Sequence, residues 1–153
     1  MNVLITGTAS AVAAQLACTL QLNGNEVTWL KYIDDECTCS NEKVCTVTGS
    51  WLIQNDLYNA LLAQDAFVLT FEGEEFTRSP ITFHIACYLK EILLDTGVSK
   101  VVLVRENNLE DGASHSDLYS ELRGINGEGL QVFVSEYVFS GPGSDIQLSM
   151  TFT

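Results

Sequence analysis

The sequence predicts a doubly wound α/β fold built on a mainly parallel sheet. The chain opens with an apolar run, Val3 to Ile5, that stops at Gly7 and is followed by small residues and a helix-forming stretch. Many parallel α/β sheets begin with this strand–turn–helix order. Short apolar runs then alternate with helical patterns, without a linker or an internal repeat, which favours parallel strands joined by helices. A length of 153 residues suits one domain over residues 1–153.

Strands and helices are expected in alternation along the chain. Asn23 and Gly24 are suited to end the first helix, and Pro80 to begin the third. The second helix has one apolar face, formed by Leu57, Leu61 and Leu62. The helices are expected at 10–22, 54–63 and 81–94, with a short helical piece at 115–123. The strands are expected at 2–6, 26–30, 44–48, 66–71, 98–104 and 130–139.

Composition indicates a globular protein of the cytoplasm. Hydrophobic residues make up 46% of the chain. No apolar run reaches the roughly 18 residues of a membrane span, and no basic stretch precedes the first apolar run. We therefore expect neither a membrane interaction nor a signal peptide. Five cysteines at irregular spacing do not resemble the framework of a secreted disulfide-rich protein.

The net charge of −13, from 20 acidic and 7 basic residues, disfavours nucleic-acid binding. Two interpretations of the acidity stay open. The simpler is that it keeps the protein soluble. The other is an acidic surface for a basic partner, or a mimic of nucleic acid.

Five segments, in order and at near-normal spacing, resemble extended short-chain dehydrogenase/reductases of the NAD-dependent epimerase/dehydratase and NmrA-like type. Residues 2–7 resemble the family's first strand and turn, and 23–30 resemble its second strand. Residues 49–71 resemble the segment from the third-strand exit to the fourth strand. Residues 81–104 resemble the next helix and strand, and 129–143 the final strand. The resemblance implies a shortened, divergent Rossmann-like fold. Because the sequence stops at Thr153, we expect the family's C-terminal substrate-binding lobe to be absent.

The resemblance places a cofactor site at the first turn and at the end of the second strand. The family's small turn residues fall on Gly7, Ser10 and Ala13, with Thr8 beside them. Gly7 would make the tight turn and Ala13 would allow close packing of helix on strand. Ser10 would cap the helix or offer its hydroxyl to a phosphate, and the cap is favoured. Lys31 stands where NAD-binding members have an acid, so any remaining dinucleotide preference would be for NADP, although a solvated lysine is the simpler interpretation.

Other cofactor positions depart from the family pattern. The acid on the adenine side falls on Ser50. Small residues normally follow the fourth strand beside the cofactor, and here they are replaced by Phe71 and Glu72. A ring and a carboxylate there would crowd the cofactor and repel its phosphates. Each 1.4 kcal/mol lost weakens binding about tenfold, so we expect no dinucleotide to bind in the usual way.

The chemistry of the family is also altered. No serine follows the fifth strand, where Val104 is succeeded by Arg105 and Glu106. The best match to the catalytic Tyr-x-x-x-Lys pair is Tyr119 with Arg123. Arginine is a poor substitute for the compact ammonium of lysine. A structural tyrosine is therefore the favoured interpretation of Tyr119.

Three cysteines in one polar segment, Cys37, Cys39 and Cys45, lack the paired spacing typical of zinc sites. Loop thiols are favoured, and a metal or redox role is the alternative. Cys18 and Cys87 fall in expected helices and are expected in the core.

The histidines and several acids are weaker candidates for a catalytic or cation site. His84 is expected to be structural, and His115, although it has a serine and an aspartate nearby, is too close to them in sequence to form a triad. A cation site is conceivable among the acids, but solvated loops are favoured for Glu72, Glu74, Glu75, Glu110 and Asp111. No metal is expected.

Two functional hypotheses follow. The favoured one is a degenerate Rossmann protein that acts as a non-catalytic binding, scaffolding or regulatory subunit. The alternative is a compact NADP-dependent oxidoreductase or epimerase-like enzyme that completes its active site with a partner subunit. A protein partner is expected in both cases, as a homodimer or a heterodimer with a larger relative, because the helix at 81–94 is apolar on most sides. Its apolar residues are Ile81, Phe83, Ile85, Ala86, Tyr88, Leu89, Ile92 and Leu93.

Overall fold

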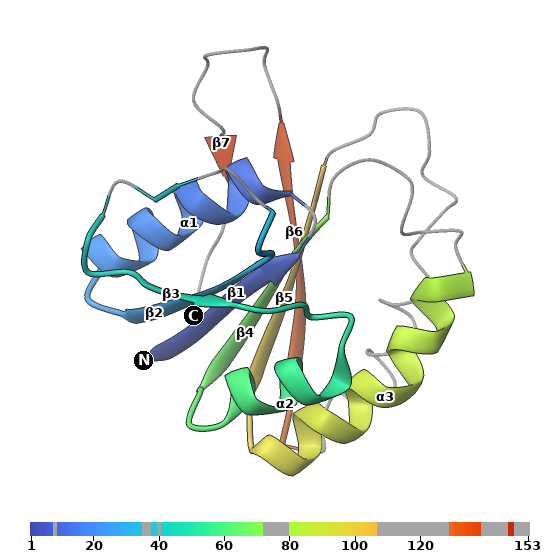
Figure 1. The fold of residues 1–153 in the computed structure, drawn as a ribbon. Helices are drawn as coiled ribbons and strands as arrows, with labels where there is room; N and C mark the ends of the chain where they lie inside the picture. Colours follow the sequence, from blue (N-terminus) through green and yellow to red (C-terminus); the bar gives the residue numbers. More distant parts are fainter. Residues whose placement is uncertain are drawn as a thin grey trace.

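The described strands form one seven-stranded sheet in the order β3-β2-β1-β4-β5-β6-β7 (Figure 1). The computed structural model describes residues 1–7, 9–34, 38–39, 41–71, 80–106, 129–138 and 147–148. For 80–87, 105–106, 134, 136–138 and 147–148 it describes the backbone alone. The strands are β1 (Asn2–Gly7), β2 (Glu26–Lys31), β3 (Cys45–Thr48), β4 (Ala66–Phe71), β5 (Lys100–Glu106), β6 (Gln131–Val138) and β7 (Gln147–Leu148). The first six are parallel, and β7 pairs antiparallel with β6. The predicted fold class is confirmed, and β7 is an addition that the sequence did not predict.

Helices cover both faces of the sheet. Helix α1 (Ser10–Leu22) lies on one face, and α2 (Gln54–Leu61) and α3 (Pro80–Thr96) lie on the other (Figure 1). The strand order reverses between β1 and β4, which is the switch point where ligands bind in open α/β sheets. Among the described residues, no helix is long and apolar enough to cross a membrane.

The core has two parts, one on each face of the sheet. On the face of α1, Val3 and Ile5 of β1 pack with Leu16 and other residues of the helix. On the face of α2 and α3, Phe67 and Leu69 of β4 pack with residues of both helices. All six residues of β4 are buried because the strand is covered on both faces, as its continuous apolar run predicts.

Helix α1 ends where the sequence indicates. Gly24 has φ +91°, the left-handed conformation that glycine adopts without strain. Its N–H donates to the Gln21 carbonyl at 3.1 Å, and the N–H of Asn25 donates to the Leu20 carbonyl at 3.1 Å. This pair of hydrogen bonds is a Schellman motif, which satisfies carbonyls at the helix end.

Several element boundaries differ from those expected, among them those of α3, which runs from Pro80 to Thr96 rather than over 81–94. Helix α2 ends at Leu61, and Leu62 has extended backbone angles and is 46% exposed, so its predicted place on the buried face was wrong. Strand β5 begins at Lys100 rather than at residue 98. The N–H and hydroxyl of Ser99 both donate to the Asp65 carbonyl, at 3.0 and 3.1 Å, which holds this residue in the connection before the strand.

Candidate functional site

Gly7 lies at the switch point, where β1 passes beside β4. Its φ is +131°, and a Cβ atom added to it would lie 2.0 Å from the Thr70 carbonyl oxygen. No side chain fits between backbones this close. The tight turn expected at Gly7 is therefore imposed by its contact with β4.

Thr70 closes the same turn from the β4 side, and the sequence analysis missed it. The side chain is fully buried. Its hydroxyl donates to the carbonyls of Thr6 and Ala9, at 3.1 and 3.4 Å. The available signal was a lone hydroxyl in an otherwise apolar buried strand, since buried hydroxyls need a hydrogen-bond partner.

Replacing Thr70 with valine is expected to destabilise the protein by about 1–2 kcal/mol, because two buried carbonyls lose their shared donor while the shape is preserved. Chemical denaturation measures the change. Thr70→Ser keeps the hydroxyl and serves as the control. A Thr70→Val variant as stable as the wild type would contradict a stabilising role of the two hydrogen bonds.

The start of α1 differs from the expected arrangement. Ser10 is the first residue of the helix, and the N-cap is Ala9, which makes no side-chain cap hydrogen bond. The predicted cap by Ser10 was wrong, because a capping residue must precede the helix to accept from its first N–H groups. Ala13 is 1% exposed and packs into the core under α1, as its small size predicts. Thr8 lies outside the described residues.

Lys31 ends β2 at the same edge of the sheet. Its Nζ lies 5.3 Å from the centroid of the Trp29 ring, within the range of a cation–π interaction. Trp29 itself is buried in the core under α1. The ring therefore gives this lysine a preferred position beside the carboxyl ends of the strands.

Four aromatic residues gather where β2, β3 and β4 end, on the face of α2 and α3. We call Tyr32, Trp51, Phe71 and Tyr88 the aromatic cluster. Trp51 is fully buried and Phe71 is 6% exposed, and their rings meet edge to face with centroids 6.2 Å apart. The Tyr88 hydroxyl lies 3.4 Å from the carbonyls of Trp51 and Leu52. Its members come from four separate segments, so the cluster could not be read from local sequence patterns.

Ser50, at the position of the family's adenine-side acid, is held inside this part of the fold. Its N–H donates to Oδ2 of Asp56 at 3.0 Å, and its hydroxyl accepts from the N–H of Leu52 at 3.2 Å. Tyr32 also hydrogen-bonds to the Ser50 side chain. These contacts engage the serine in the turn before α2.

Both tyrosines of the aromatic cluster stay protonated at physiological pH. Burial raises the pKa of Tyr88 to about 12, with a further contribution from Tyr32. Burial also raises the pKa of Tyr32, although hydrogen bonds with the side chains of Ser50 and Trp51 lower it again in part. A general base requires a pKa near the working pH. Neither hydroxyl is thus suited to acid–base catalysis near neutrality.

The raised pKa of Tyr88 predicts a loss of stability in alkali. The unfolded chain releases this proton at about pH 10 but the folded chain only at about 12. The stabilisation is thus complete below pH 10 and is lost as the pH rises toward 12. Urea denaturation should show a shallower decline over this range for Tyr88→Phe than for the wild type. The control is Tyr58→Phe, because Tyr58 of α2 is partly exposed, and its stability should decline like that of the wild type. An unchanged slope in Tyr88→Phe would contradict the assignment.

Several candidate residues are not placed. Tyr119, Arg123, His115, Glu72 and Cys37 lie outside the described residues, as do Glu74, Glu75, Glu110 and Asp111. The backbone of His84 lies in α3.

Strand β5 continues through Arg105 and Glu106, so the expected end at Val104 was two residues early.

The cysteines are arranged differently from the sequence expectation. Cys18 is partly exposed rather than in the core, and its Sγ lies 2.7 Å from Sγ of Cys39. Cys45 is exposed on β3. Among the described residues no three His, Cys, Asp or Glu side chains are grouped to hold a metal ion.

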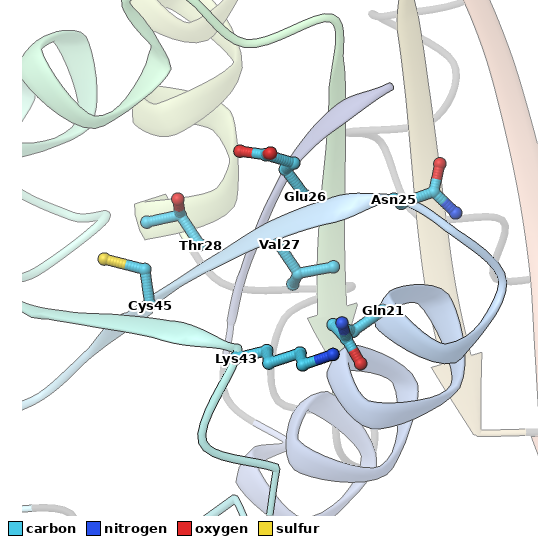
Figure 2. A pocket seen from close by; sticks show the side chains of 7 residues that line it. All are labelled: Gln21, Asn25, Glu26, Val27, Thr28, Lys43 and Cys45. Carbon is cyan, nitrogen blue, oxygen red and sulfur yellow. The ribbon is translucent and has the colours of Figure 1, made fainter.

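A pocket of about 270 Å³ lies at the opposite edge of the sheet. It is formed where α1 ends and where β2 and β3 begin, and Figure 2 shows its lining residues: Gln21, Asn25, Glu26, Val27, Thr28, Lys43 and Cys45. Glu26 and Lys43 give it one acid and one base. Ligands of doubly wound sheets bind at the carboxyl ends of the strands, and this pocket is at the amino ends. The candidate site therefore remains at the edge that holds Gly7 and Lys31.

Comparison with known proteins identifies the fold. No family model matches the chain, and no curated protein matches it in sequence. Among solved structures, a UDP-glucose 4-epimerase with UDP-glucose from Thermotoga maritima has a TM-score of 0.66 at 16% identity over 88% of this chain and 54% of its own. A Rossmann-fold NAD(P)-binding family protein from Shigella flexneri scores 0.63 at 16% identity, over 99% and 75%. A short-chain dehydrogenase/reductase from Veillonella parvula scores 0.62 at 13% identity, over 92% and 72%.

The chain thus has the Rossmann-like fold of NAD(P)-binding proteins, and the resemblance read from its segments is confirmed at the level of the fold. It spans between about half and three quarters of the length of these three structures. A shared fold does not transfer an activity. Function must therefore be argued from the residues at the switch point.

Proposed function

We propose that this protein is a degenerate Rossmann protein that acts as a non-catalytic binding, scaffolding or regulatory subunit and does not hold a dinucleotide in the usual way. The observation that carries the proposal is the packing of Phe71 against Trp51 at the end of β4. The resembled family has small residues at this point, next to the cofactor. Here the position holds Phe71, whose ring packs edge to face with that of Trp51, and this packing supports the loss of room for a dinucleotide.

The charges and pKa values of the site support the same conclusion. The net charge of −13 disfavours approach of a polyanionic cofactor. Burial raises the pKa values of Tyr32 and Tyr88, the described tyrosines of the aromatic cluster, which makes them still less suited to act as a general base. The turn also departs from the family pattern, because Ser10 carries a side chain where a glycine would let the backbone approach pyrophosphate.

One observation favours the alternative of a compact NADP-dependent enzyme. Lys31 is at the end of β2, where a 2′-phosphate would lie, and the Trp29 ring supports its side chain. An ammonium can pair with a phosphate there. In this alternative Tyr119 and Arg123 supply the catalytic pair, and a partner subunit completes the substrate site.

Thermal unfolding with NAD, NADH, NADP and NADPH separates the two proposals. A ligand present at 100 times its Kd stabilises a protein by about 2.7 kcal/mol, which raises Tm by roughly 5–10 °C for a chain of this size. We expect no rise at millimolar dinucleotide. A saturable rise that Ser10→Asp abolishes, through an added negative charge at the start of α1, would support the enzyme instead.

A protein partner is still proposed, but fewer exposed apolar residues support it than the sequence suggested. In the described part of α3, Tyr88, Leu89, Ile92 and Leu93 are buried against the chain's own sheet and need no partner. Among the described residues, exposed apolar side chains on α3 and on or beside α2 support a partner: Leu94, Leu52, Ile53, Tyr58 and Leu62. Sedimentation at tens of micromolar should show a dimer, and a single monomer boundary would contradict a homodimer. The cytoplasmic location stays a prediction from composition.

A further inference from the structure

Two described residues of the connection between β2 and β3 lie against one stripe of α1. Ala14, Cys18 and Gln21 are four and three residues apart, so they share one side of the helix. Cys39 and Asn41 of the connection lie against this stripe. The Cys39 thiol contacts Cys18 and lies 3.8 Å from the Ala14 carbonyl, and the Asn41 side chain donates to the Gln21 side chain.

The thiols of Cys18 and Cys39 are in direct contact. The Sγ atoms are 2.7 Å apart, although the residues are 21 positions apart in the sequence. A disulfide requires sulfurs about 2.05 Å apart. The two sulfurs therefore already lie close to bonding distance.

The surroundings of the pair also suit a covalent link. Cys39 is partly buried and packs against the core under α1. Both thiols are partly exposed, so a small oxidant can reach them. Cys45 is exposed on β3, at the other end of the connection.

We propose that Cys18 and Cys39 form a reversible disulfide that fastens the β2–β3 connection to α1. The proposal is independent of dinucleotide binding. The oxidant is a small-molecule disulfide such as oxidised glutathione. One cysteine thiolate attacks it and releases the first small thiol, leaving a mixed disulfide on the protein. The second cysteine attacks the protein sulfur of that mixed disulfide, forms the Cys18–Cys39 bond and releases the second small thiol. Two electrons and two protons pass from the cysteines to the two released thiols.

The connection starts directly after Lys31, at the edge of the candidate site. A bond would fix Cys39 to α1. The redox state of the pair would therefore decide how firmly Cys39 is held, without altering the sheet. A reversible bond would make this part of the fold respond to oxidants, whereas two cysteines that only pack together would not.

Exchange is expected to be slow at neutral pH. Burial raises the pKa of the Cys39 thiol, and its hydrogen bond with Cys18 raises it further. The thiolate is the reactive form, so little of Cys39 reacts at pH 7. The test is best run to equilibrium at a pH of about 8.5, where ordinary thiols are half ionised.

The test is a peptide map of the purified full chain after equilibration with oxidised glutathione. We expect the mass of a single chain to fall by two hydrogens, with one peptide pair joined through Cys18 and Cys39. Tm of the oxidised protein should exceed that of the reduced protein by roughly 5–10 °C, because the bond closes a loop of about 20 residues in the unfolded chain. Dithiothreitol should reverse both changes.

Matched variants assign the link. Cys45→Ser should keep the joined peptides and the rise in Tm, whereas Cys18→Ser and Cys39→Ser should lose both. Three results would overturn the proposal: a link to Cys37, Cys45 or Cys87 in place of the Cys18–Cys39 link, a disulfide between two chains, or glutathione attached to Cys18 and Cys39 without a bond between them. The map of the wild-type chain decides among these outcomes even if a variant folds poorly.

Discussion

Replacing Gly7 with alanine should lower the free energy of unfolding by more than about 3 kcal/mol, a large part of the stability of a typical domain. The added Cβ would lie 2.0 Å from the Thr70 carbonyl oxygen, so β1 or β4 would have to move. The φ of +131° adds strain of its own, because side chains disfavour it. The measurement is the midpoint of urea denaturation.

Two other glycines provide the control for Gly7. Gly24 and Gly97 also have positive φ, at +91° and +75°, but a Cβ at either would have no neighbour within 4 Å. Alanine there should cost about 1–2 kcal/mol, the conformational strain alone. A cost at Gly7 no larger than at these positions would show that β1 and β4 are not in close contact at the switch point.

Truncating Trp51 to alanine should cost about 3–5 kcal/mol, the usual range for a large buried aromatic side chain. Trp51 is fully buried and its ring meets Phe71 edge to face. The change would leave a cavity between the strand ends and α3. Thermal and urea denaturation would both register it.

Leu52 is the matched control for Trp51 because it is the next residue of the same turn and is 39% exposed. Leu52→Ala should cost about 1–2 kcal/mol, less than the truncation of Trp51, since part of the Leu52 side chain is already exposed to water. The Tyr88 hydroxyl contacts only the backbone of Leu52, which this change preserves. Similar losses for the two variants would contradict the view that the aromatic cluster fills the end of the sheet.

Local patterns were sufficient for much of the fold. The continuous apolar run of β4 predicted a strand buried on both faces, and Asn23 with Gly24 predicted the end of α1. These features depend on neighbours in the sequence. The parallel, doubly wound arrangement followed from the alternation of strand and helix patterns.

The candidate site was less predictable because it depends on contacts between distant segments. Gly7 could be assigned from its turn, but the need for glycine there comes from Thr70 on another strand. Cys18 was expected in the core from its helix, and only the path of the β2–β3 connection brings Cys39 to it. The expected cap by Ser10 failed because Ser10 is already the first residue of the helix and Ala9 occupies the cap position.

The central claim is that the switch point no longer holds a dinucleotide, and calorimetric titration of the full chain with NADPH tests it most directly. We predict no saturable heat up to millimolar NADPH for the wild type. Micromolar binding that is lost in Lys31→Ala but kept in Lys43→Ala, a lysine at the opposite edge of the sheet, would contradict the claim and establish an NADP-type site at the end of β2.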